Sequence, residues 1–301
     1  MTAASLGGVA IWRRFRDHRP AVLSALVLAV LAAASASAPL VESALGHDAQ
    51  EADLVNRFAP PSADHPLGAD ELGRDVLLRL LYGGQVSLFV GVAAALASGV
   101  IGTLIGLVSG YRGGRLDALL MRVADGVIAL PLLPFLIVLA AADLSKLGLP
   151  DWIRQSGAVD LWRIILLITL FGWTTAARLV RGVTLSMRER EFVRAALALG
   201  AGGGRIMFVH ILPNVVSPAV VATTLSVGHV VLFESVLSFL GLGIQPPRAS
   251  WGNMLSGAQE LIWSAPELVF YPGALIFVTV IAFNALGDGL QDALDPRSRY
   301  R

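Results

Sequence analysis

Two acidic residues interrupt otherwise apolar stretches of this chain and are the first candidates for chemistry. Glu234 and Asp125 each lie in a segment long enough to cross a bilayer, where a charge is costly and usually faces a partner or a water-filled path. Glu234 is therefore a candidate pathway residue; alternatively, it pairs with a hydroxyl, a backbone group or a basic side chain near the outer membrane surface. Asp125 can pair with Arg122, one helical turn away. These two residues do not form the chain of acidic groups that a proton-driven carrier uses.

Other residues suited to catalysis or metal binding form no recognisable pattern. The chain has no cysteine, and its histidines do not occur at metal-ligand spacing. They are His18, His47, His65, His210 and His229. The sequence contains neither the G-x-x-x-x-G-K-[ST] phosphate loop nor the H-E-x-x-H zinc motif. We therefore expect no catalytic residues, no metal site and no cofactor bound by this chain.

The composition indicates that lipid surrounds most of the folded chain. Of 301 residues, 55% are hydrophobic and 15% are charged, against roughly a quarter charged in an ordinary soluble domain. This apolar content excludes a disordered chain. A formal net charge of +1 lacks the basic excess of a nucleic-acid binder.

Six apolar stretches are long enough to be considered as membrane spans, because about 20 helical residues cross the hydrocarbon core. They are 21–41, 85–109, 116–142, 161–180, 214–240 and 268–287. The fourth is the weakest candidate, since only 164–177 is free of charge. In the second, Gly102, Gly106 and Gly110 lie on one helix face and predict close packing against another helix. The fold class is all-α, a polytopic membrane protein with six transmembrane helices.

The distribution of basic residues predicts that both termini face the cytoplasm. An even number of spans puts the termini on one side, and basic residues concentrate in cytoplasmic loops. Placing the N-terminus inside puts 16 of the 23 basic residues there. These are Arg13, Arg14, Arg16, Arg19, Arg112, Arg115, Arg122, Arg178, Arg181, Arg188, Arg190, Arg194, Arg205, Arg297, Arg299 and Arg301. The outer segment 48–75 is instead rich in Asp and Glu.

The first span has a second interpretation. A basic start, an apolar run and the small residues 35–38 also describe a cleavable signal peptide. Cleavage would leave five spans, so a cytoplasmic C-terminus would require an N-terminus outside. The run is long for the apolar part of a signal peptide, which favours a retained helix.

The cytoplasmic loop 187–214 contains a predicted short helix from Glu191 to Leu199, with Gly200 as a left-handed C-cap. A second short helix is predicted over 205–211, stopped by Pro213. The loop is either an ordinary amphipathic connector or a docking element for another protein. The pattern alone does not separate these two interpretations.

Three segments resemble known transporter motifs. The run Glu191-Phe-Val-Arg-Ala-Ala, followed by Gly200 and Leu212-Pro-Asn, resembles the EAA loop of permease subunits of bacterial ABC importers. The segment 65–75, His-Pro-Leu-Gly-Ala-Asp-Glu-Leu-Gly-Arg-Asp, resembles the outer segment of the dipeptide, oligopeptide and nickel permease family. The segments 234–247 and 250–252 resemble the same family.

The resemblance implies a type I ABC importer permease fold in the bacterial inner membrane. It further implies a heterodimer with a homologous permease, two ATP-binding subunits that hold ATP and Mg, and an extracytoplasmic solute-binding protein. Residues 1–82 would form an N-terminal region with the basic tail, the first span, retained as a helix, and an outer segment. Residues 83–301 would form a five-helix core that contains the coupling loop 187–214.

Within this family the EAA loop forms a helix that docks into a groove of the ATPase. The positions that match the pattern are Glu191, Ala195, Ala196, Gly200, Leu212 and Pro213, whereas Arg194 and His210 replace the usual glutamate and isoleucine. The implied function is alternating-access import of peptides, with nickel or another small solute as the alternative. A secondary transporter, a channel and a membrane-bound enzyme are further alternatives, each without supporting groups in the sequence.

Overall fold

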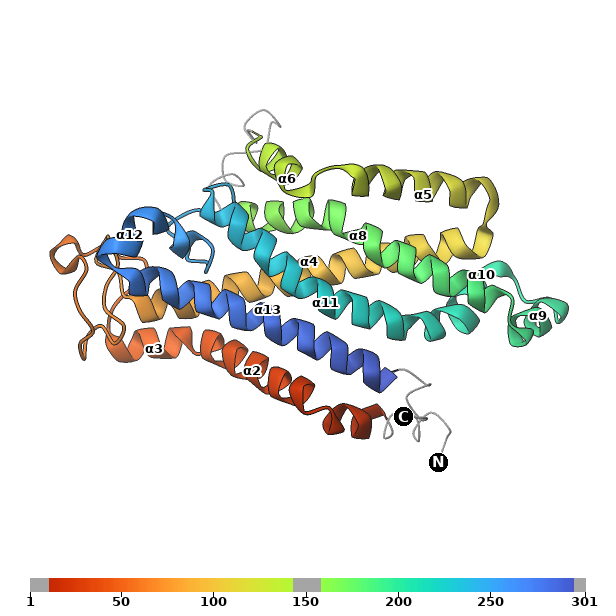
Figure 1. Cartoon of the computed structure of the whole chain (residues 1–301), viewed down its shortest axis with the longest axis horizontal. Coiled ribbons are helices and arrows are strands. Elements are labelled where there is room, and N and C mark those ends of the chain that lie inside the picture. Colours follow the sequence, from red (N-terminus) through yellow and green to blue (C-terminus); the bar gives the residue numbers. More distant parts are fainter. Residues whose placement is uncertain (1–10, 143–157, 295–301) are drawn as a thin grey trace.

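The computed structural model describes residues 11–142 and 158–294, and in this part of the chain every regular element is a helix. Long helices run side by side along one axis (Figure 1). Five of them are long and apolar enough to cross a membrane. They are α2 (Arg19–Ala36), α4 (Val76–Arg112), α8 (Ala158–Arg188), α11 (Leu212–Phe239) and α13 (Pro266–Leu294). The all-helical prediction is confirmed, and α4 begins before the domain boundary predicted after residue 82.

The third predicted span is bent rather than straight. It consists of α5 (Gly114–Ala129) and α6 (Leu132–Ala140), whose axes differ by 85°. Pro131 disfavours the α conformation of Leu130, which is extended with ψ 137°, so the helix ends there. Because α4 ends and α8 begins at opposite ends of the bundle, the pair still carries the chain from one end to the other (Figure 1). The span predicted over 116–142 is therefore a bent pair of helices, and the described residues contain five candidate spans, or six if this pair counts as one.

The first span is an integral part of the bundle. Helix α2 ends at Ala36, and α3 (Ala38–Leu45) follows after a break at Ser37, so the predicted single helix to Val41 is interrupted. Gln85 Nε2 of α4 donates a hydrogen bond of 2.7 Å to Ser35 O at the end of α2. These contacts favour the retained helix over a removable signal peptide.

Glycines bring α4 and α8 into direct backbone contact, as the four-residue spacing predicts. A Cβ on Gly102 would overlap the carbonyl oxygen of Trp173, and one on Gly106 would overlap that of Ala177. At Gly110 a Cβ would lie 2.7 Å from Thr184 Cβ. The small-residue face of α4 is therefore the surface against which α8 packs.

The two ends of the bundle carry different elements. The first turn of α2, the last turn of α13 and the short helix α9 (Glu191–Ala198) lie at one end, whereas α3 and α12 (Ala258–Ser264) lie at the other (Figure 1). This arrangement agrees with both termini on the side of the 187–214 loop. We call the end with α9 the inner end and the end with α12 the outer end.

The segment predicted as a separate second helix is instead continuous with a span. Helix α10 (Gly203–Arg205) leads into the π-helical turn η3 (Ile206–Ile211), which passes directly into α11. Pro213 is the second residue of α11 and directly follows the π-helical turn η3, at whose end the Leu212 N–H bonds back to Met207 O. The helical run therefore continues through Pro213, although this residue has no N–H to donate, and Pro213 does not stop the preceding helix.

Candidate functional site

Helix α9 presents two different faces. Val193 is fully buried and Ala196 is 9% exposed, both against the rest of the chain. Phe192, Arg194 and Leu197 are exposed on the opposite side. The capping predicted from sequence is confirmed, because Gly200 has φ +82° immediately after the C-cap residue Leu199. The surface that α9 offers to another molecule is thus amphipathic, and Ala196 lies beneath it.

The inner face of α9 rests on one apolar cluster that unites the inner ends of three spans. Val193 belongs to the same buried cluster as Leu107 of α4, Val180 of α8 and Val215 of α11. Ile206 and Ile211 of η3 are also part of this cluster. A displacement of α9 therefore acts directly on α8 and η3, and on α4 and α11 through the cluster.

Charged residues at the start of α9 pair with one another at the surface. Glu189 accepts hydrogen bonds from Arg194 Nη2 at 3.0 Å and from Arg188 Nε at 3.3 Å. These bonds, with that of Arg194 the larger cause, hold the pKa of the Glu189 carboxyl below its usual range. Arg194 thus has a local partner where the EAA pattern usually has glutamate.

The other carried-over residues lie at the entry of α11. His210 is half-buried in η3, and its carbonyl oxygen accepts a bond of 2.8 Å from Asn214 Nδ2. Leu212 is half-buried beside the cluster under α9, and Pro213 is exposed. The structure brings these residues to the same end as α9, and their roles in docking stay predictions.

A cavity lies beside the middle of the long helices. It measures about 590 Å³, is lined by residues of α4, α5, α6, α8 and α11, and is open on one side. Its polar lining consists of hydroxyls and one imidazole, from Ser98, Thr174, Thr175, Thr223, Ser226 and His229. No carboxylate, ammonium or guanidinium group is among its lining residues. No sequence pattern predicts this set, because single hydroxyls in apolar helices are ordinary.

Towards the outer end an apolar cluster lies beside the cavity. Leu136 of α6, Phe171 of α8 and Leu237 of α11 are buried together, and Leu136 and Phe171 also line the cavity. Phe135 and Phe171 make an edge-to-face contact with centroids 5.5 Å apart. The bend at Pro131 positions α6 for this contact.

Glu234 is fully buried beside the cavity rather than in it. Its carboxylate accepts hydrogen bonds from Ser238 Oγ at 2.7 Å and from Ser87 Oγ of α4 at 3.0 Å. Ser87 Oγ in turn accepts a bond of 3.2 Å from the backbone N–H of Trp251. This arrangement matches the alternative of hydroxyl pairing, so the geometry supplies no contact for the predicted pathway role.

Two ion pairs hold α5 against α8. Asp125 pairs with Arg178 of the facing helix α8, not with Arg122 as predicted, because α5 and α8 pack side by side and bring Arg178 within reach. Asp117 accepts from Arg181 Nη2 at 2.6 Å and also from Ser109 of α4. Neither carboxylate is isolated within the bundle.

Comparison with known proteins identifies the family. The model described as binding-protein-dependent transport system inner membrane component matches residues 102–300, and the one described as N-terminal TM domain of oligopeptide transport permease C matches residues 8–61. The oligopeptide transport system permease protein of Bacillus subtilis is 37% identical, with 97% of this chain and 91% of that protein aligned.

Two further relatives give the same result. The dipeptide transport system permease protein of Bacillus subtilis is 40% identical over 96% of this chain and 85% of its own length. The oligopeptide transport system permease protein of Haemophilus influenzae is 37% identical over 98% of this chain and 91% of its own length. The chain therefore belongs to the family of binding-protein-dependent transport system inner membrane components.

Proposed function

We propose that this chain is the permease subunit that forms half of the translocation pathway of an ATP-driven peptide importer. The observation that carries the proposal is the 37–40% identity, over nearly the full length, to permeases named for oligopeptide and dipeptide transport. The chain is a multi-pass inner-membrane component and is not itself the ATPase. The division into an N-terminal region, 1–82, and a five-helix core, 83–301, is part of this proposal.

The family description implies a binding protein and ATPase partners. In detail, the assembly contains a second, homologous permease, two ATP-binding subunits that carry ATP and Mg, and an extracytoplasmic solute-binding protein. Lipid surrounds the two permeases, and nucleic acid has no part in the assembly.

Helix α9 transmits the movement of the ATPases. Its exposed face, with Phe192, Arg194 and Leu197, supplies the contact, and its buried face rests on the shared cluster beneath it. ATP binding in the partners then shifts a two-state permease between its inward and outward openings, since the two states offer α9 different contacts. Gly200 allows the chain to reverse sharply after α9.

The cavity of about 590 Å³ is this subunit's share of the pathway. Thr174, Thr223 and Ser226 donate their hydroxyl protons to backbone carbonyl oxygens of their own helices, so their oxygens are left to accept from the amide N–H groups that every peptide carries. A lining without formal charges forms no ion pair with an acidic or basic side chain of the peptide and repels neither kind. This suits a pathway for peptides of varied sequence.

Nickel is the second candidate solute. A pathway for a divalent cation favours clustered His, Asp or Glu ligands, and the described residues contain no group of three or more such side chains placed to hold a metal ion. His229 lies in the cavity with hydroxyl neighbours. The lining thus favours peptides over nickel.

Purification tests the assembly. The tagged chain, extracted in mild detergent from its native membrane, is expected to retain a second permease and ATPases, which mass spectrometry identifies. The binding protein of the same system is then assayed for a dipeptide and for Ni²⁺. A chain that purifies alone and moves solute in liposomes without ATP is a channel or secondary carrier, and a binding protein selective for Ni²⁺ favours the second candidate.

A further inference from the structure

A second, smaller pocket opens at the outer end, between the segment 70–79 and the loop 241–256. It measures about 180 Å³, well below the 300–1,000 Å³ typical of sites for drug-sized ligands. Glu71, Leu72, Gln245 and Pro246 line it and are partly or fully exposed, so they form its mouth. The pocket has room for one side chain and not for a peptide.

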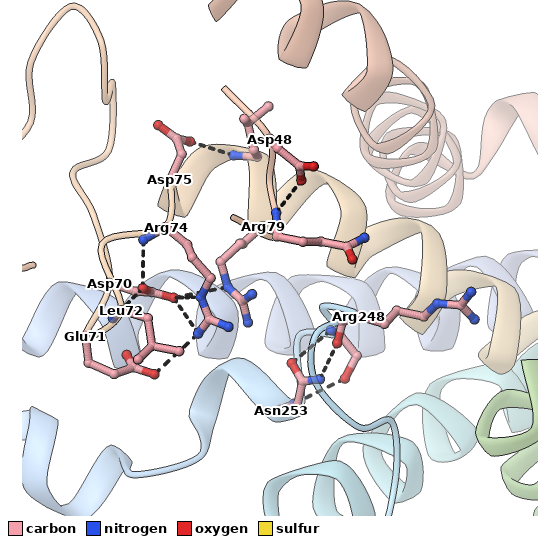
Figure 2. A network of polar contacts seen from close by, with 12 residues as sticks. Asp48, Asp70, Glu71, Leu72, Arg74, Asp75, Arg79, Arg248 and Asn253 are labelled. Atoms are coloured by element: carbon pink, nitrogen blue, oxygen red, sulfur yellow. Dashed lines mark hydrogen bonds and ion pairs between the residues drawn. The ribbon is translucent and has the colours of Figure 1, made fainter. Parts of the chain in front are cut away.

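The opposite wall of the pocket carries two buried arginines. Arg74 and Arg79 both line it, and their side chains are 7% and 5% exposed. Figure 2 shows the two guanidinium groups side by side next to Asp70, with Asn253 of the other loop below them. Asn253 completes the polar wall, and its side chain bonds the Arg248 carbonyl oxygen at 2.7 Å.

Asp70, the buried carboxylate of this cluster, already pairs with Arg74. Asp70 Oδ2 accepts from Arg74 Nε at 2.8 Å, and Asp70 Oδ1 accepts from the backbone N–H groups of Leu72 and Arg74 at 2.8 and 3.0 Å. Glu71 lies 3.5 Å from Arg74 Nη2 and is 43% exposed. Arg74 is therefore paired by two acids.

Arg79 is left with an incomplete set of acceptors. Its Nε lies 3.3 Å from Asp70 Oδ2, an oxygen that Arg74 also uses. Its Nη1 is buried and has no hydrogen-bond partner among the described residues. Within the buried part of the cluster, two arginines therefore face one aspartate, and a buried cation without its full set of acceptors is costly.

We propose that this pocket accepts a carboxylate side chain, Asp or Glu, of the extracytoplasmic solute-binding protein when that protein docks on the outer end. This inference rests on the proposed function. A carboxylate supplies the charge and the acceptor oxygens that the guanidinium of Arg79 lacks, with the planar geometry that arginine matches best. Glu71 at the mouth repels an acidic side chain in the free state and limits the affinity.

The test uses the complete transporter in lipid nanodiscs and its solute-loaded binding protein, with affinity measured by surface plasmon resonance. Arg79→Gln is expected to weaken binding at least about tenfold, as loss of a buried charged partner does. The matched control Arg57→Gln removes an exposed outer arginine of the same charge and is expected to leave the affinity unchanged. Basal ATP hydrolysis and a monodisperse elution profile establish that each variant is folded.

Two further experiments test the inference if Arg79→Gln does not fold. Glu71→Gln is expected to tighten binding roughly threefold by removing the repulsion at the mouth. Sodium propionate, compared with sodium chloride at equal ionic strength, is expected to compete with the binding protein. An affinity that none of these changes alters would show that the pocket holds only water and overturn the inference, whereas a wild-type transporter that binds no binding protein would contradict the proposed function itself.

Discussion

The inner and outer ends of the molecule hold their charges in opposite ways. At the inner end Glu189 and Arg194 pair at the surface, with side chains 59% and 68% exposed. At the outer end Asp70 and Arg74 pair with side chains 8% and 7% exposed. A surface pair can break and reform at little cost, whereas a buried pair fixes the chain around it. In the proposed function, the inner end moves with a partner and the outer end serves as a rigid platform.

Hydrogen bonds at the outer end also join segments that lie far apart in the sequence. Trp251 Nε1 donates to Leu80 O at 2.9 Å, and its backbone N–H donates to Ser87 Oγ. Both bonds join the loop after α11 to the first half of α4. At the inner end α9 is held mainly by the apolar cluster under Val193, which has no directional bonds. Apolar contacts allow small shifts that a hydrogen-bonded network resists.

Loss of the buried charge at the outer end is expected to have the largest effect. Asp70→Asn leaves Arg79 buried without a negative partner and leaves Arg74 only the partly exposed Glu71, which is expected to lower the free energy of unfolding by about 3–5 kcal/mol. Thermal unfolding of the purified transporter in detergent measures the change. The surface variant Glu189→Gln is the comparison, and equal melting temperatures for the two would remove the contrast between the ends.

Helix α4 reaches from the outer end to the inner end and packs closely against α8, and Gly106 tests that packing. Gly106→Val places methyl groups where the Ala177 carbonyl lies and is expected to cost about 1–3 kcal/mol by forcing the helices apart. Gly126→Ala, in open space on α5, is the control and is expected to be neutral or slightly stabilising. Intact stability and transport in Gly106→Val would contradict the close α4–α8 contact.

Substitutions at two neighbouring alanines, Ala195 and Ala196, test the exposed face and the buried face of α9 separately. Ala196→Asp buries a carboxylate and is expected to unseat the helix and uncouple ATP hydrolysis from transport, with a stability cost of about 1–3 kcal/mol. Ala195→Asp changes the exposed face and is expected to weaken coupling while the melting temperature stays unchanged. ATPase and uptake assays on proteoliposomes measure both. Normal transport-dependent ATP hydrolysis in Ala196→Asp would refute the assignment of α9.

The smallest effect is expected when the pH is changed, through protonation of Glu189 at the inner end. The pKa of Glu189 is lowered by Arg194 and Arg188, so its pairing is fully present above the unfolded pKa of about 4.3 and is lost only as pH falls through the lower folded value. Coupling should therefore be insensitive to Glu189 protonation between neutral and mildly acidic pH. Wild type and Glu189→Gln are compared across this range, and a pH-dependent gap between them would contradict the prediction.

Features governed by neighbouring residues could be predicted from the sequence. The span count, the glycine face of α4, and α9 with its cap at Gly200 all follow from local periodicity and capping. The effects of two prolines were not predicted. Pro131 ends a helix within a span that hydropathy alone treats as continuous, and Pro213 does not stop the helix before it, because the π-helical turn η3 continues directly into α11.

Features made by distant segments could not be predicted. Asp125 pairs with Arg178 of another helix, and although hydroxyl pairing of Glu234 was one of the predicted alternatives, the sequence did not indicate that the hydroxyls are those of Ser87 and Ser238. The pocket at Arg79 exists only because the segment 70–79 lies against the loop 241–256. No sequence pattern records which of several charges in a segment becomes buried, since that depends on packing between segments far apart in the chain.

Uptake of a labelled dipeptide into proteoliposomes tests the central claim most directly. The liposomes contain the complete transporter, with ATP enclosed on the ATPase side and the binding protein outside. We expect uptake that requires both ATP and the binding protein and that falls when Ala195→Asp alters the exposed face of α9. Uptake that continues without ATP, or that Ala195→Asp leaves unchanged, would contradict the account of a peptide pathway driven through this inner-end helix.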